Sequence, residues 1–518
     1  MATVQRFTFC IGRQTARLQV GPPGLRRAAP DRRGAWWAWG GISRSVAVVA
    51  TGDARIVWQH IRSEPDLATG TATVFVRYRL ANAGSGPFAA TLDGSIEGTA
   101  ATIHAPVTIP AQGTIEVDAQ VTLSKEAVRL WHFDHPNLYR LTTTLGSAAG
   151  LLHRASDRFG IRKVELVRDG LLLNGERVRL CGLNRVSDSS ATGATEPDAL
   201  VRQDVTLMKQ ANANLCRLMH VAQAPNLLDL LDEKGMLIWA EIPVWGEGDP
   251  QVKDSQSRLP EQWMRETIER DYNHPCIIGW SVGNELKNHF DYVKRMLEFT
   301  RGLDPHRIAT HVSFTCFSGK LDVARDPTSI SPITMPNVYG MGTAGATERM
   351  HQRWPNQPIF FTEFGMSQFG NALESRIDKL EDMFHRAVDG HSSVIGVSLW
   401  TYNDYRSDYK GTPVSGFRAW GIVDDARRPK AAYAQVRALF SPVHGLSRQG
   451  NRVEVVPRSP EEIPSFTLRG YRLAWDGGGV DLPELAPGAA TWSTVVSAPP
   501  GVEIRLMTPT GFDVASCR

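Results

Sequence analysis

Two glutamates stand out because each accompanies a run of apolar residues that predicts a buried strand. Glu285 closes the run IIGWSVGNE, and Glu363 lies in PIFFTEFG. A carboxylate in such a place either belongs to a site or opens a following helix, where the positive end of the helix dipole favours negative charge. For Glu285 taken alone, both interpretations stay open.

A pair of carboxyl groups supports a specific chemistry. Cleavage of a glycosidic bond uses one carboxylic acid to protonate the leaving oxygen and a second carboxylate to attack the anomeric carbon, and a separation of about 5–5.5 Å gives retention of configuration. The acid must begin protonated near neutral pH, so we expect the charge of Glu363 to raise the pKa of Glu285. Glu241, in WAEIPVW, is a third acidic candidate that we interpret as support for the site.

The elements that would position these side chains alternate between apolar strands and helices after about residue 170. Helical patterns at 198–213 and 224–235 separate the strands, as in a parallel sheet with helices packed outside it. Eight strand candidates within about 270 residues match the size of one (β/α)8 barrel. They are VRLCGLN (178–184), NLCRLM (214–219), MLIWAEI (236–242), IIGWSVGNE (277–285), IATHVSF (308–314), ITMPNVY (333–339), PIFFTEFG (358–365) and VIGVSLW (394–400).

We therefore expect a TIM barrel over residues 166–441. Catalytic residues of such barrels lie at the carboxyl ends of the strands, where the βα loops build the site. Strands four and seven lie across the barrel mouth from one another, so a substrate would fit between Glu285 and Glu363.

Alternating apolar and polar residues predict β-sandwich domains on both sides of the barrel, over 51–165 and 442–518. Strand-like segments before the barrel occupy 45–50, 54–61, 71–80 and 113–123, and those after it lie within 453–460, 464–479 and 500–509.

Composition argues against several other classes of protein. The 518 residues include 57 basic and 54 acidic side chains without long like-charge runs, so no nucleic-acid partner and no membrane surface is indicated. The 6 cysteines form no CxxC pair, which predicts free thiols. No apolar run is long enough to span a bilayer and the first residues lack a signal-peptide core, so a cytoplasmic location is expected; a missing N-terminus would make a secreted or periplasmic one the alternative.

Four segments together resemble glycoside hydrolase family 2, which contains β-galactosidases, β-glucuronidases and β-mannosidases. They are WWAWGGISRSV (36–46), LWHFDHPNLYRLTTTL (130–145), FGIRKVELVRDGLLLNGERVRLCGLNR (159–185) and NLCRLMH (214–220). The resemblance implies Glu285 as acid/base and Glu363 as nucleophile. It also implies that the sandwiches are immunoglobulin-like and that residues 1–50 are a remnant of the family's N-terminal jelly-roll domain.

The resemblance implies further contacts to the sugar. Asn284 would bond the hydroxyl next to the anomeric centre, with a helix N-cap as its structural alternative. His220 follows strand two and would approach the sugar site, with a purely structural histidine as the alternative. Arg217 would position a catalytic glutamate by charge-assisted hydrogen bonds, or would simply pair within the barrel.

Four more residues near strand ends are candidates for substrate binding. Tyr339 ends strand six and would donate to the nucleophile, and Trp400 ends strand eight and would stack on the apolar face of a sugar. Ordinary core packing is the alternative for both. Asp188 and Asp404 lie in loops after strands one and eight and would bind hydroxyls, although solvated loop carboxylates are common.

The loop after strand eight bears on the choice of sugar. β-Glucuronidases usually carry an Asn-x-Lys motif there, and this chain has Arg418-Ala419-Trp420 instead. A neutral sugar is expected, with a β-galactoside first and a glucuronide next, for which Arg406, Lys410 or Arg418 would offer positive charge. The shortened N-terminal domain leaves a catalytically inactive carbohydrate-binding protein as an alternative.

No cluster of His, Asp or Glu has metal-ligand spacing, so no cofactor is expected to be required. An accessory Mg²⁺ or Na⁺ ion is compatible with the resemblance, as is a homo-oligomer.

Overall fold

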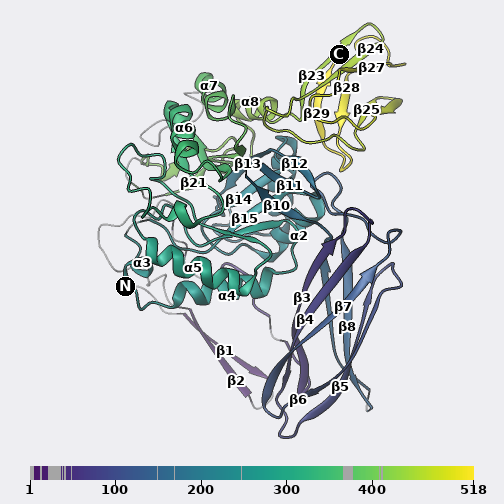
Figure 1. Cartoon of the computed structure of the whole chain (residues 1–518), viewed down its shortest axis with the longest axis vertical. Coiled ribbons are helices and arrows are strands. Elements are labelled where there is room, and N and C mark those ends of the chain that lie inside the picture. Colours follow the sequence, from purple (N-terminus) through teal and green to yellow (C-terminus); the bar gives the residue numbers. More distant parts are fainter. Residues whose placement is uncertain are drawn as a thin grey trace.

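The computed structural model confirms a multidomain fold in which a (β/α)8 barrel is flanked by two β-rich domains. These two domains lie at opposite ends of the long axis (Figure 1). The structure describes residues 5–11, 14–20, 37, 39 and 42–518, with the exception of 48, 149, 169, 247, 366–376, 408, 410 and 411.

All eight predicted barrel strands are present and form one parallel sheet in the order β17-β16-β15-β14-β13-β20-β19-β18. The sheet closes where Ser313 bridges Pro336, just beyond β17 and just before β18. The strands are β13 (Leu180–Arg185), β14 (Leu215–Leu218), β15 (Leu237–Glu241), β16 (Ile277–Ser281), β17 (Ile308–Thr310), β18 (Asn337–Tyr339), β19 (Ile359–Gly365) and β20 (Val394–Leu399). A short hairpin follows β20 and consists of β21 (Tyr405–Arg406) and β22 (Phe417–Arg418).

Amphipathic helices alternate with these strands, and the helices predicted at 198–213 and 224–235 are both confirmed. They are α1 (Asp198–Gln210), α2 (Pro225–Lys234), α3 (Pro250–Lys253), α4 (Leu259–Asp271), α5 (Phe290–Leu303), α6 (Thr343–Arg353), α7 (Ile377–Val388) and α8 (Ala431–Leu439), with short 3-10 turns at Pro327–Ile330 and Gly340–Gly342.

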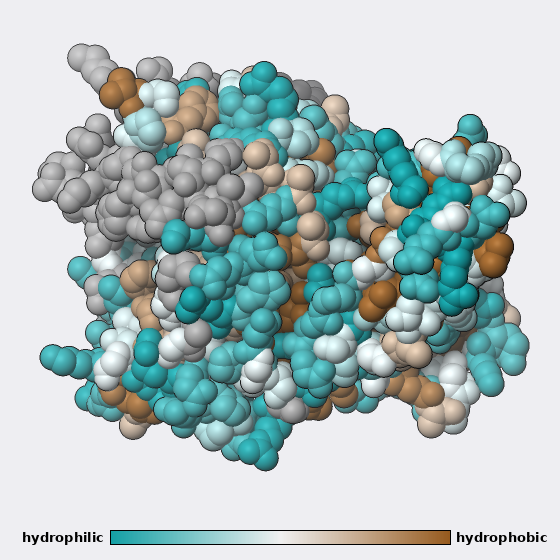
Figure 2. Space-filling model, turned by 90° about the horizontal axis from the view of Figure 1, so that it is seen from above, coloured by the Kyte–Doolittle hydropathy of each residue, from teal (hydrophilic) through white to brown (hydrophobic). Residues whose placement is uncertain are grey.

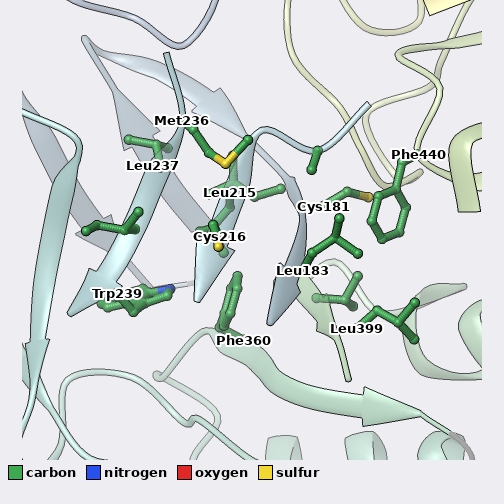
Figure 3. Packing of buried hydrophobic residues seen from close by; sticks show 14 of the residues in the cluster. Cys181, Leu183, Leu215, Cys216, Met236, Leu237, Trp239, Phe360, Leu399 and Phe440 are labelled. Carbon is green, nitrogen blue, oxygen red and sulfur yellow. The ribbon is translucent and has the colours of Figure 1, made fainter. Parts of the chain in front are cut away.

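Two large aromatic side chains pack inside the barrel. The rings of Trp239 on β15 and Phe360 on β19 lie 5.8 Å apart at an angle of 57° (Figure 3). Glycines make room for them: a Cβ at Gly279 would lie 2.3 Å from the Trp239 ring, and one at Gly396 would lie 2.6 Å from the Phe360 ring. The barrel interior is therefore a packed core that supports the loops above it.

The N-terminal sandwich has a three-stranded sheet, β3-β4-β7, and a four-stranded sheet, β6-β5-β8-β9, packed around one apolar cluster. Its strands are β3 (Ala54–Pro65), β4 (Ala72–Asn82), β5 (Phe88–Ile96), β6 (Thr102–Ile109), β7 (Gly113–Leu123), β8 (Tyr139–Ser147) and β9 (Gly150–Phe159). The strand predicted at 45–50 is wrong for the described residues there, because Val46 and Val49 are exposed and have no sheet to pack against.

A small antiparallel sheet joins the sandwich to the barrel, and a second sandwich follows the barrel. The connecting strands are β10 (Val164–Val167), β11 (Gly170–Leu173) and β12 (Glu176–Val178). The second sandwich pairs β23-β24-β27 and β26-β25-β28-β29, whose bounds are β23 (Val443–Gln449), β24 (Arg452–Pro457), β25 (Arg472–Trp475), β26 (Gly478–Asp481), β27 (Trp492–Val495), β28 (Ile504–Met507) and β29 (Asp513–Cys517).

Most of the jelly-roll remnant predicted over 1–50 lies outside the described residues. Its described strands, β1 (Gln5–Ile11) and β2 (Gln14–Val20), pair only with each other. The described cysteines 181, 216, 276, 316 and 517 are free thiols, as predicted. Within the described part of the chain, no helix is long and apolar enough to cross a membrane, and the face in Figure 2 is largely hydrophilic.

Candidate active site

Glu285 lies in a loop, which corrects the predicted strand end. Strand β16 stops at Ser281, and Glu285 has a positive φ of 56°. Helix α5 begins only at Phe290, so neither Glu285 nor Asn284 belongs to the first turn or the N-cap of that helix. Both helix-start interpretations are therefore wrong. Glu363, by contrast, lies within β19 as predicted.

Main-chain hydrogen bonds fix the loop that carries Glu285. On one side, Asn284 N–H donates to Val244 O, and Gly246 N–H donates to Asn284 O, each at 2.9 Å. On the other side, Val312 N–H donates to Gly283 O at 3.0 Å. The loop thus continues the barrel sheet for a few residues between the loops that follow β15 and β17.

Arg217, at the end of β14, is the centre of the buried polar network. Its Nη1 donates to Glu363 Oε1 at 2.6 Å, and its Nη2 donates to Glu241 Oε2 at 3.0 Å. Nη2 also donates to Asn284 Oδ1 at 2.8 Å. The two carboxylates raise the pKa of Arg217 against the lowering effect of burial, so this guanidinium stays charged.

His220 and Glu241 form a second contact within the same network. His220 Nδ1 is hydrogen-bonded to Glu241 Oε1, which directs Nε2 to within 4.0 Å of Glu363 Oε1. Ser281 Oγ donates to the other oxygen of Glu241 at 2.7 Å. Burial alone would raise the pKa of Glu241, but Arg217 and His220 bring it down to about 2. Glu241 is therefore a permanent anion that positions its neighbours.

Tyr339 and Asn337, both on β18, contact the two predicted catalytic residues. Tyr339 OH donates to Glu363 Oε2. Asn337 Nδ2 donates to Glu285 Oε1 and to Asn284 Oδ1, both at 3.2 Å. Because Cα of Asn337 pairs with that of Glu363 in the sheet register, β18 and β19 bring both carboxyl groups to one place.

The two carboxyl groups differ in their environment. Glu363 receives hydrogen bonds on both oxygens, one from a guanidinium and one from a phenol. Among the described residues Glu285 has one side-chain donor, the amide of Asn337, and burial followed by the charge of Glu363 raises its pKa to about 7. Glu285 therefore binds a proton near neutral pH, whereas Glu363 accepts hydrogen bonds from two strong donors.

Trp400 lies beside this network in a small apolar cluster at the barrel mouth. Its ring packs edge-on against Tyr405 at 5.8 Å, and Tyr339 and Trp420 pack against the same cluster with rings 6.2 Å apart. Trp400 is only 3% exposed. Trp400 therefore lies at the end of the strand, as predicted. It also packs in the core, which was the alternative interpretation of this residue.

Asp188 and Asp404 bind neighbouring loops. Asp188 accepts from Trp39 Nε1 at 2.7 Å and from the backbone N–H of Arg406 at 2.6 Å. Asp404 accepts from the N–H of Gly421 at 2.8 Å and forms an ion pair with Lys430 Nζ at 2.7 Å. These contacts hold the segments around the mouth, so the structure does not favour either residue as a hydroxyl ligand.

The sequence interpretation missed Asn337 and Asn184. Both are single amides at the ends of otherwise apolar barrel strands, and this was the available signal. Asn184 Oδ1 accepts from Arg217 Nη1 at 3.2 Å, while its amide group donates to Thr362 O at 2.9 Å. It thereby holds Arg217 against β19.

One group of three potential metal ligands occurs among the described residues, and it lies away from the glutamates. Asp232, His274 and Cys276 meet at the amino end of β16. Both oxygens of Asp232 are already engaged, one with His274 Nδ1 at 2.6 Å and one with the N–H of Cys276 at 3.0 Å. This cluster is explained as a hydrogen-bonded support for the end of the strand.

Two family models match adjacent parts of the chain. The model described as "Glycosyl hydrolases family 2, TIM barrel domain" matches residues 164–445, and the model described as "Glycosyl hydrolases family 2" matches residues 54–162. The first covers the barrel and the second covers the N-terminal sandwich.

Curated relatives cover only parts of the chain. A β-galactosidase of Thermoanaerobacter pseudethanolicus is 37% identical over 196 residues, which are 37% of this chain and 26% of that protein. A β-glucuronidase of Paenibacillus borealis is 28% identical over 354 residues, 62% of this chain and 58% of that protein. The chain thus spans between about a quarter and six-tenths of these relatives.

Solved structures share the fold over most of the chain. A family 2 β-galacturonidase from Eisenbergiella tayi, bound to galacturonate, has a TM-score of 0.69 and 24% identity, covering 78% of this chain and 75% of that one. A Bacteroides uniformis β-glucuronidase has a TM-score of 0.73 and 22% identity, covering 95% of this chain and 64% of that one.

Proposed function

The chain belongs to glycosyl hydrolase family 2, and we propose that it is a retaining, exo-acting β-glycosidase. Glu363 is the nucleophile and Glu285 is the acid/base. The observation that carries this assignment is the unequal environment of the two carboxyl groups. Glu363 is bound by Arg217 and Tyr339, whereas burial and the neighbouring charge raise the pKa of Glu285 to about 7.

In the first step, a carboxylate oxygen of Glu363 attacks the anomeric carbon while the carboxylic acid of Glu285 gives its proton to the glycosidic oxygen. The bond between the anomeric carbon and that oxygen breaks, the aglycone leaves as an alcohol, and a glycosyl ester forms on Glu363. Esterification removes the negative charge of Glu363, so the pKa of Glu285 falls.

In the second step, the Glu285 carboxylate takes a proton from water, and the water oxygen attacks the anomeric carbon. The ester bond breaks and Glu363 leaves as a carboxylate, with Arg217 and Tyr339 stabilising the returning charge. Two displacements restore the original anomeric configuration. No step requires a cofactor, so we expect chelation to leave turnover intact; an accessory Mg²⁺ or Na⁺ ion would serve only to bind or orient the sugar.

Asn284 and His220 orient the sugar. Oδ1 of Asn284 is occupied by Arg217 and Asn337, so its Nδ2 is the free end and donates to a hydroxyl near the anomeric carbon. The contact between His220 Nδ1 and Glu241 orients the ring so that Nε2 lies 4.0 Å from Glu363 Oε1, beside the place where we expect the sugar. Trp400 forms part of the apolar wall at this mouth.

A terminal β-galactoside is our first choice of substrate because the Asn-x-Lys motif associated with glucuronides is missing. A β-uronide is the second candidate, and one observation favours it. Arg418 is buried, and its guanidinium lies over the rings of Tyr405, Tyr409 and Trp420 at 5.8, 5.6 and 5.4 Å. Lys410 lies outside the described residues, and Arg406 belongs to the opposite face of the β21–β22 hairpin, where it packs on Trp39.

Nitrophenyl β-glycosides of galactose, glucuronate and galacturonate test the proposal. Turnover by the wild type and a loss of about 10⁴-fold or more in Glu363→Ala are expected. A 2-deoxy-2-fluoro glycoside should label Glu363, and NMR should detect the β-anomer as the first product. An inverted product overturns the retaining mechanism, and binding without turnover by the wild type indicates a carbohydrate-binding protein.

A further inference from the structure

A pocket of about 540 Å³ lies at the amino end of the barrel, where the N-terminal sandwich meets it; we call it the interdomain pocket. Strand β3, the segment after β9, the segment after α4 and the residues before β17 all contribute to its lining. Pro275 of its lining precedes β16 whereas Glu285 follows that strand, so the pocket and the glutamates lie at opposite ends of the barrel. The volume of the pocket is in the range of small-molecule sites.

Arg162 lines this pocket with an unused edge of its guanidinium. Its Nε donates to Pro275 O, and its Nη2 donates to Ile277 O at 2.6 Å. Among the described residues, no carboxylate lies within ion-pair distance of Arg162, and its Nη1 has no hydrogen-bond partner. Burial, and then the neighbouring Arg307, lower the pKa of Arg162 to about 9, which still leaves it charged at neutral pH. An anion at Nη1 would supply the missing partner.

The remaining charged groups around the pocket have partners. Arg307 forms an ion pair with Asp304 at 2.7 Å, and it donates to Ile277 O, the same carbonyl that Arg162 uses. The other pairs are Arg62 with Glu64 and Lys163 with Glu165, while Asp66 accepts from the N–H groups of an exposed turn at Ala68 and Thr69. Arg162 is therefore the charge on this wall that lacks a counter-ion.

The walls are fixed from both domains. His60 of the sandwich stacks on Tyr272 at 4.3 Å with the rings 7° from parallel, and the guanidinium of Arg307 lies over the same Tyr272 ring, 5.2 Å from its centroid. Asn273 accepts from the N–H of Ile61 at 2.7 Å and donates to Gln59 O at 2.8 Å. The pocket exists before any ligand arrives, which lowers the entropic cost of binding.

We propose that the interdomain pocket binds a small organic anion of about monosaccharide size, whose carboxylate or phosphate group is held by Arg162. The polar Ser63 and Thr73 and the ring of Tyr272 provide contacts for an uncharged, hydroxyl-bearing body. Because both domains line the pocket, the ligand stabilises their contact. The inference is independent of the proposed glycosidase activity.

Thermal unfolding of the full chain tests this proposal with glucose 6-phosphate, glucuronate and inorganic phosphate as probes and glucose as the neutral control. We expect an anion to raise the unfolding temperature of the wild type by about 2 °C or more, and glucose to leave it unchanged. Glucose 6-phosphate and glucuronate distinguish a ligand with a phosphate group from one with a carboxylate group. Arg162→Met should abolish the shift, and Lys163→Met, which removes an exposed and already paired charge from the same lining, should retain it.

Equal shifts in the wild type and Arg162→Met would place the anion elsewhere and overturn the proposal, as would the absence of a shift with every probe. If Arg162→Met does not fold, selenate soaked into wild-type crystals decides the matter. Anomalous density within hydrogen-bonding distance of Arg162 Nη1 supports the site, and its absence there overturns it.

Discussion

The buried cluster around Arg217 at the carboxyl end of the barrel and the cluster around Arg162 at the amino end have opposite excess charge. At the carboxyl end, Glu241, Glu285 and Glu363 surround the single guanidinium of Arg217. At the amino end, Arg162 and Arg307 converge on one carbonyl with Asp304 as the nearest paired carboxylate. At the carboxyl end, burial and then the charge of Glu363 raise the pKa of Glu285 to about 7, whereas at the amino end the excess guanidinium leaves a donor for an anion.

The two clusters differ in whether a charged side chain is shared between partners or has partners of its own. Arg217 is divided between two carboxylates, and a third carboxyl group nearby, Glu285, forms no ion pair with any described residue. Asp304, in contrast, has Arg307, Trp280 Nε1 and a backbone N–H. A charged side chain that has all of its partners stabilises the fold. One that lacks a partner is available for catalysis or ligand binding.

Replacing the shared arginine has the largest expected effect. Arg217→Met leaves Glu241 and Glu363 buried without the guanidinium that both bind and should lower the free energy of unfolding by about 3–5 kcal/mol, in addition to abolishing turnover. Arg307→Met is the matched change at the other end and should cost only about 1–3 kcal/mol, because Asp304 keeps other donors. Denaturant unfolding followed by tryptophan fluorescence checks both; equal losses would remove the distinction between the two ends.

Removal of the acid should impair only the steps that need a proton. In Glu285→Gln, turnover of substrates with poor leaving groups is expected to fall by about 10²–10⁴-fold, with a smaller loss for a dinitrophenyl leaving group. Added azide should restore turnover and give a β-glycosyl azide. Asp291→Asn, an exposed change on α5, serves as the control; a uniform loss across leaving groups would contradict the assignment.

Loss of the phenol should be milder. Tyr339→Phe removes one hydrogen bond to the charged Glu363, worth about 1.5–3 kcal/mol, so kcat should fall by roughly 10–10²-fold with little change in KM. Tyr433→Phe removes a phenol that bonds a carbonyl outside the site and should leave kcat unchanged. Rates that match the wild type in Tyr339→Phe would mean that Arg217 alone stabilises the nucleophile.

The smallest expected effect concerns pH. Because Glu285 acts as an acid while protonated, kcat/KM should fall as pH rises through about 7. The amide of Asn337 favours the ionised form, so Asn337→Ala should raise the pKa of Glu285 and move the alkaline limb to higher pH. If the alkaline limb moves to lower pH instead, the group that titrates there is not Glu285.

Sequence reasoning succeeded for the barrel because each of its strands is buried on both faces and reads as a continuous apolar run. The same feature misplaced Glu285, since Val282 and Gly283 prolong the apolar run of β16 after the strand has ended. Strands β5, β6, β8 and β9 escaped notice because Thr, Gly and Ser interrupt their alternation.

For the site, residue types could be predicted but not their contacts. The strand-end rule located Glu241 and Tyr339, and the family resemblance indicated Arg217. That Arg217 joins Glu241 to Glu363 depends on closure of the barrel, which brings β14, β15 and β19 together and cannot be read from spacing along the chain. Asn337 was overlooked for the same reason, because only the folded barrel shows which side chains it contacts.

The loop that carries Glu285 is held by the loops after β15 and β17, whereas Glu363 is held by its own strand. Insertions or deletions in those two neighbouring loops would therefore relocate the proton donor and leave the nucleophile in place. During divergence, the leaving-group side of such a catalyst can adapt to new aglycones while the half that forms the covalent bond is inherited unchanged. The two catalytic carboxyl groups therefore depend on different parts of the chain for their positions.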